Sequence, residues 1–103
     1  MITIANKRTY HGNGIYIGRP SVFGNPIHLD AECMRDQVLL EYETYLKRQL
    51  SRQRAFYRQF LALVHTYHQT GSLILICWCN PNPCHGHILA KYIEDYARAE
   101  SLI

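Results

Sequence analysis

Residues 73–87 read LILICWCNPNPCHGH, an apolar run that leads directly into cysteines and histidines. The run 73–78 is too short for a helix and is bounded by turn-forming residues, so it predicts a buried central β-strand. Asn82 and Pro83 then favour the start of a helix, because asparagine caps helix N-termini and proline suits the first helical position. We therefore expect a strand, a turn and a capped helix, with the reactive side chains at their junction.

The rest of the chain predicts a small α/β domain. In chain order we expect strand 2–5, a turn at 11–14, strand 15–18, a loop over 19–30, helix 31–50 and a second helix that is capped by Ser51 and ends near Gly71. The alternative for these two helices is one long bent helix. The first two strands are expected to pair as a hairpin across their glycine-containing turn. The predicted order is β-β-α-α-β-α, with a short central sheet of about three strands flanked by helices.

Length and composition set the class of protein. The 103 residues are enough for one core and too few for two, so residues 1–103 are expected to form a single domain. The chain has 48% hydrophobic and 18% charged residues and a net charge of +3, which permits an anionic partner without requiring one. We expect a cytoplasmic protein that does not enter a membrane, because the sequence has neither a signal peptide nor a long apolar segment. In that compartment the four cysteines are expected to be thiols or metal ligands.

The junction after strand 73–78 is the first candidate site. Side chains alternate along a strand, so Cys77 and Cys79 are expected on the same face if the strand extends that far. Cys84 and His85 would occupy the second and third positions of the following helix, where the helix dipole lowers the pKa of a thiol. Gly86 would let a ligand approach the backbone closely.

Three interpretations of these residues remain open. In the first, Cys84 is a nucleophile or an anion-binding thiolate, and His85 or His87 is its proton partner. In the second, a structural zinc ion is held by Cys77, Cys79, Cys84 and either His85 or His87, although the cysteine spacing is not the usual C-x₂-C pairing. In the third, Cys77 and Cys79 are small buried residues and His85 only caps a helix. Cys77 is expected to pack in the core under any of them.

The loop after strand 15–18 is the companion region. If this strand runs parallel to strand 73–78, both loops leave the same edge of the sheet, where ligands of open α/β sheets bind. Arg19 would offer donors to a phosphate or carboxylate, Asn25 a selective amide, and Ser21 a further donor. The alternative is that the loop is only shaped by its prolines and glycine, and that Arg19 pairs with an acidic residue.

Basic residues also gather in the middle of the chain. We name this group the junction patch, and it comprises Lys47, Arg48, Arg52, Arg54 and Arg58, with Tyr57 among them. Such a group can contact nucleic-acid phosphates. Nearby glutamates and the absence of a nucleic-acid-binding motif favour a solvated face instead.

Two motifs carry a family resemblance. YIGRPSVFGNPI together with LICWCNPNPCHGHILA resembles the bacterial and phage family catalogued as domain of unknown function 4326. The resemblance spans nearly the whole chain and assigns no activity. It implies that the following positions belong to the family motif: Gly18, Arg19, Pro20, Gly24, Asn25, Pro26, Arg35, Cys77, Trp78, Cys79, Pro81, Cys84, His85 and Gly86. Ile27 stands where the family usually has phenylalanine, which is a change in packing.

The combined expectation is one site at the edge of the sheet. Cys84 and His85 are its candidate catalytic residues, and Arg19, Ser21, Asn25, Cys79 and Gly86 are its candidate ligand-binding residues. The predicted function is a nucleotide- or nucleic-acid-related enzyme or binding domain for a small anionic ligand. The alternative is a zinc-stabilised interaction module without catalysis, in which Cys77, Cys79, Cys84 and His87 bind the metal.

Overall fold

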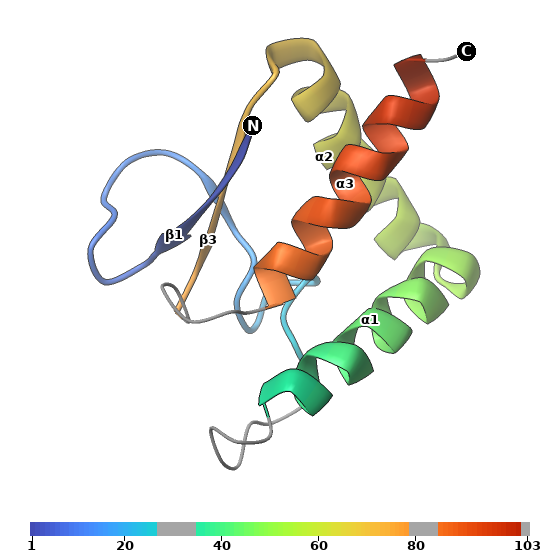
Figure 1. The fold of residues 1–103 in the computed structure, drawn as a ribbon, viewed down its shortest axis with the longest axis horizontal. Helices are drawn as coiled ribbons and strands as arrows, with labels where there is room; N and C mark the ends of the chain where they lie inside the picture. The colour runs from blue at the N-terminus through green and yellow to red at the C-terminus, as the bar shows by residue number, and fades with distance from the viewer. Residues whose placement is uncertain (27–34, 79–84, 102–103) are drawn as a thin grey trace.

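The computed structural model describes residues 1–26, 35–78 and 85–101 (Figure 1). Its elements follow the predicted order β-β-α-α-β-α. They are β1 (Ile2–Asn6), β2 (Ile15–Tyr16), α1 (Arg35–Arg52), α2 (Arg54–Thr70), β3 (Leu73–Cys77) and α3 (His85–Ser101). No helix in these residues is both long and apolar enough to cross a membrane.

The three strands form one parallel sheet in the order β1-β3-β2. The predicted central strand is therefore confirmed, because β3 pairs on both sides: Leu75 lies opposite Ile4 of β1 and opposite Ile15 of β2. A continuous apolar run is typical of a central strand in a parallel sheet, because side chains on both of its faces are covered.

The predicted hairpin between the first two strands is wrong, because β3 lies between them. The hairpin was predicted from the glycines of the turn at 11–14, and the position of Gly14 explains the error. A Cβ atom on Gly14 would lie 2.8 Å from Ile76 Cδ1 and 3.0 Å from the Ile74 carbonyl oxygen. This glycine allows the chain to approach β3 closely as it enters β2, and it does not mark a reversal into an antiparallel partner.

The three helices lie together on one side of the sheet (Figure 1). Alternate residues of β3, namely Leu73, Leu75 and Cys77, are buried, whereas Ile74 and Ile76 are half-buried. The fully buried side chains come from every layer and include Ile17, Tyr42, Leu46, Phe60, Val64, Leu75, Leu89 and Ile93. The core therefore lies between the helices and one face of the sheet, which confirms a small α/β domain.

Two separate helices occupy the middle of the chain. The break lies at Gln53, whose φ of −111° and ψ of 102° are extended, so the predicted cap at Ser51 is wrong. Ser51 belongs to α1, and its hydroxyl donates to the Arg48 carbonyl oxygen at 3.1 Å. The predicted end of α2 is confirmed, because Gly71 adopts the left-handed conformation at φ 76° and its N–H donates to the Tyr67 carbonyl oxygen. The predicted first turn of the earlier helix, residues 31–34, lies outside the described residues.

Candidate functional site

The carboxyl ends of the three strands meet at one edge of the sheet, because all of the strands are parallel. This arrangement confirms that the loops after the second and third strands leave the same edge. We name this region the carboxyl edge, and its described polar and aromatic residues are Asn6, Lys7, Arg8, Tyr16, Arg19, Trp78 and His85. Parallel α/β sheets commonly bind their ligands at this position.

His85 is the most deeply placed polar residue of the carboxyl edge. Its side chain is only 6% exposed, and its Nε2 lies 2.8 Å from the Ile17 carbonyl oxygen. The ring also packs edge-to-face on Tyr42, with 5.1 Å between the ring centroids. A carbonyl oxygen can only accept a hydrogen bond, so Nε2 carries the proton and the neutral ring has its lone pair on Nδ1.

The surroundings of His85 favour its neutral form. Burial lowers the pKa of this imidazole below the usual histidine value, and the positive charges of Arg19 and His87 lower it further. The hydrogen bond to Ile17 and the proximity of Cys77 raise the pKa and offset part of this effect. His85 is therefore neutral at pH 7, with Nδ1 as its basic atom, and a general base must be in this state.

The Arg19 loop is closed by contacts within itself. The Arg19 Nε donates to the Asn25 carbonyl oxygen at 2.7 Å, and the N–H of Ser21 donates to the Gly18 carbonyl oxygen at 2.8 Å. Gly24 allows this closure, because a Cβ atom there would lie 3.1 Å from the Arg19 Cα. The structure therefore brings Arg19 and Asn25 together, through the main chain of Asn25. The selective role of the Asn25 amide stays a prediction.

Ser21 lies inside the same loop. Its hydroxyl oxygen is buried, and the described residues provide it with no hydrogen-bond partner. Next to it, the Phe23 carbonyl oxygen accepts a hydrogen bond from the Tyr42 hydroxyl at 2.9 Å. Tyr42 thus contacts both the ring of His85 and the Arg19 loop, and it holds the two halves of the carboxyl edge against α1.

Trp78 forms the exposed aromatic part of the carboxyl edge. The residue is 50% exposed, in contrast to Cys77, which is fully buried as predicted. The indole Nε1 donates to the Tyr16 hydroxyl at 2.9 Å, and that hydroxyl donates in turn to the Arg19 carbonyl oxygen at 2.7 Å. The Asn6 side-chain amide donates to the Trp78 carbonyl oxygen at 3.2 Å. These contacts connect the ends of all three strands.

Two cations complete the carboxyl edge and were missed by the sequence prediction. The Lys7 Nζ lies 5.1 Å from the centroid of the Tyr16 ring, and the Arg8 Cζ lies 5.9 Å from the centroid of the Trp78 ring. Both distances are within the range of cation–π contacts. A hairpin would have placed both residues in its connecting turn. The sequence did contain a signal for them, namely a basic pair directly after a strand. In a parallel sheet such a pair is expected at the carboxyl edge.

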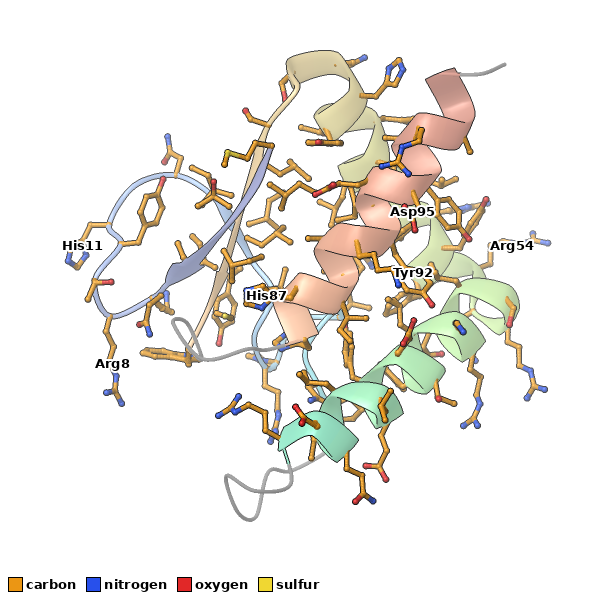
Figure 2. The ribbon with its side chains drawn as sticks, viewed as in Figure 1. Arg8, His11, Arg54, His87, Tyr92 and Asp95 are labelled. Carbon is orange, nitrogen blue, oxygen red and sulfur yellow. The ribbon has the colours of Figure 1, made fainter. Side chains whose placement is uncertain are left out.

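The remaining predicted site residues divide into two groups. Cys79 and Cys84 lie outside the described residues. Gly86 is buried at the start of α3, next to His85, and His87 is exposed (Figure 2). Within residues 1–26, 35–78 and 85–101, no cluster of three His, Cys, Asp or Glu side chains is placed to hold a metal ion. The proposed set of zinc ligands includes both undescribed cysteines and remains a prediction.

The junction patch lies away from the carboxyl edge. Arg54 and Arg8 lie on opposite sides of the molecule in the view of Figure 2. All five basic residues of the patch are exposed, as is Tyr57. This exposure agrees with the predicted solvated face, and nucleic-acid binding by the patch stays a prediction.

The comparisons with known proteins give one match. No curated protein and no solved structure was found to match the chain. The profile of the family described as Domain of unknown function (DUF4326) matches residues 2–95, which include every described residue of the carboxyl edge. The chain therefore belongs to the DUF4326 family.

Proposed function

We propose that this domain binds a small anionic ligand of the nucleotide class at the carboxyl edge. The observation that carries the proposal is the hydrogen bond between His85 Nε2 and the Ile17 carbonyl oxygen. It joins the start of α3 to the segment that leads into Arg19, although the two residues are 68 positions apart in the chain. A neutral proton acceptor and a permanent cation are thereby held at one edge of a rigid sheet.

The distribution of charge supports an anion. All eight acidic residues lie in residues 30–43 and 94–100, so neither the segment 1–29 nor the segment 44–93 contains an aspartate or a glutamate. The segments 7–14 and 17–29, which follow β1 and β2, therefore contain Lys7, Arg8 and Arg19 and no acidic residue. The positive end of the α3 dipole adds to the same field.

In the catalytic form of this proposal, Cys84 is the nucleophile and His85 accepts its proton. The support is that the two residues are adjacent in sequence, and that the pKa of His85 is lowered so that the ring is neutral at pH 7. The non-catalytic alternative is the zinc module. Stoichiometric zinc in the purified protein, lost on Cys84→Ser, would favour the zinc module and contradict a free thiolate.

Calorimetric titration with inorganic pyrophosphate tests anion binding directly. Arg19→Gln removes the charge and keeps an amide donor that can reach the Asn25 carbonyl. We expect its affinity to fall about fivefold or more, as for the loss of a charge-assisted contact. Arg58→Gln, on the exposed face of α2, is the matched control and should bind as the unmodified protein does. Absence of binding by the unmodified protein, or an equal loss in both variants, would contradict the proposal.

A further inference from the structure

We infer that Trp78 is a stacking platform for a nucleobase whose phosphate is held by the cations of the carboxyl edge. The inference rests on the proposed function, since it names the chemistry of the ligand that this edge takes. The ligand must combine a flat aromatic ring with an adjacent negative charge. A nucleotide, either free or within a single strand of nucleic acid, has this combination.

The first observation is the way in which Trp78 is held. Half of this large apolar side chain is exposed, and its residue is fixed at two points. The indole Nε1 donates to the Tyr16 hydroxyl, and the backbone carbonyl accepts from Asn6. The only N–H of the indole is thus already used inside the protein, so the exposed part of the ring offers its π surface and not a donor. Stacking of bases on such rings is tolerant of sequence, because every base has a π face.

The second observation is the position of Arg8. Its Cζ lies 5.9 Å from the centroid of the Trp78 ring, within the range of a cation–π contact. A base that stacks on the exposed part of the indole would therefore lie close to this cation, which is available to its phosphate.

The third observation is the placing of charge around the aromatic pair. Lys7 lies over the ring of Tyr16, and the carbonyl oxygen of Arg19 accepts from the hydroxyl of that same tyrosine. Arg8 lies over the ring of Trp78, so each of the two rings has a cation from the segment after β1 beside it. An aromatic ligand without a negative charge would leave these cations without a role in binding. A base together with its phosphate engages both the rings and the cations.

The experiment uses the fluorescence of Trp78, which is the single tryptophan of the chain. The probes are a short oligothymidylate, thymidine 5′-monophosphate, inorganic pyrophosphate and phosphatidylserine vesicles. We expect oligothymidylate to quench the emission and pyrophosphate to bind with little quenching, because only the former places a ring on the indole. Quenching by the monophosphate at equal affinity would identify a free nucleotide as the ligand. Tighter binding by the oligomer would identify a strand.

Variants separate stacking from charge, with binding read from the anisotropy of a labelled oligothymidylate. Trp78→Leu should weaken binding roughly 5- to 150-fold, the range expected for loss of one stacked base. Trp78→Phe, which keeps a ring, should lose less. Tyr57→Leu replaces an exposed aromatic residue of the junction patch and should bind as the unmodified protein does. Thermal unfolding of each variant identifies any loss that comes from the fold.

The outcomes of the two proposals can be told apart. Pyrophosphate binding without any quenching by oligothymidylate, or equal oligothymidylate affinities for Trp78→Leu and Tyr57→Leu, would overturn the stacking site and leave the anion site standing. Quenching by oligothymidylate without binding of pyrophosphate would support the stacking site and count against the anion site. A change in Trp78 emission with anionic vesicles alone would overturn the stacking site in favour of a lipid surface.

Discussion

Two groups of exposed basic residues differ in what surrounds them. At the carboxyl edge, Lys7 and Arg8 lie over aromatic rings, and the Arg19 Nε donates to a backbone carbonyl oxygen. In the junction patch, the structure shows no hydrogen bond or ion pair from the five basic side chains to any of the residues that it describes. The first group is fixed by three parallel strands and the start of α3, whereas the second projects from two helices into solvent.

This difference shows that the number of cations in a region and the fixed arrangement of those cations affect ligand binding in different ways. Exposed cations on a helix attract any polyanion weakly and lose the attraction as salt rises. Cations held beside fixed aromatic rings can in addition select the shape of a ligand. The junction patch, which contains more basic residues, is therefore the poorer candidate for a specific site.

The largest expected effect concerns stability. His85→Ala should lower the free energy of unfolding by roughly 2–4 kcal/mol, because it leaves a cavity beside Tyr42 and a buried Ile17 carbonyl oxygen without its donor. Arg54→Ala in the junction patch should change it by less than about 0.5 kcal/mol. Urea unfolding of both variants measures the contrast. Equal losses would show that the carboxyl edge is no more integrated into the fold than the junction patch.

The next effect concerns anion binding. Replacing both Lys7 and Arg8 by glutamine should weaken the binding of oligothymidylate about tenfold at low salt and reduce the salt slope by roughly one for each lost phosphate contact. The same double change at Arg54 and Arg58 removes an equal charge and should have a much smaller effect. If both double variants lose affinity equally, net charge explains the binding and the comparison between the two regions fails.

A smaller effect is expected from a single hydroxyl group. Tyr16→Phe removes the oxygen that accepts from Trp78 and donates to the Arg19 carbonyl, which should cost about 1 kcal/mol of stability and alter the Trp78 emission. Tyr57→Phe serves as the control and should change neither property. An unchanged emission spectrum in Tyr16→Phe would contradict the connection between the strand ends.

The smallest expected effect is a dependence of stability on pH. The folded protein lowers the pKa of His85, so the unfolded chain binds a proton more readily. Stability from this group is fully present above the unfolded pKa of about 6.5 and is lost as the pH falls below it. His85→Gln, which keeps a donor toward Ile17, should flatten this part of the profile, whereas Tyr57→Phe, which replaces no group that changes charge in this pH range, should not. Parallel profiles for the two variants would exclude His85 as the cause.

The sequence allowed the centre of the sheet to be predicted, but not its neighbours. The apolar run 73–77 is typical of a strand that lies between two others. The predicted start of the last helix at Asn82 and Pro83 lies outside the described residues. The approach of β2 to β3 involves the close contact of Gly14 with Ile76, which no local pattern records. Because the first two strands were wrongly predicted to form a hairpin, Lys7 and Arg8 were not included in the predicted site.

The candidate site could be predicted only in part for a similar reason. The common edge of the two loops follows from parallel strands, so Arg19 and His85 were placed together correctly. The burial of His85 depends on Ile17 and Tyr42, which are remote in sequence and show no pairing signal. Contacts of this kind arise from tertiary packing and not from local propensity.

Backbone NMR with inorganic pyrophosphate shows directly which of the two basic regions binds an anion. A two-dimensional amide spectrum reports on the carboxyl edge and the junction patch in the same titration. Binding at the carboxyl edge predicts saturable changes in the amide chemical shifts of residues 6–8, 16–25, 78 and 85–87. The amide signals of residues 47–58 should not change. Chemical-shift changes confined to residues 47–58, or no change at the carboxyl edge at saturation, would contradict anion binding at the carboxyl edge.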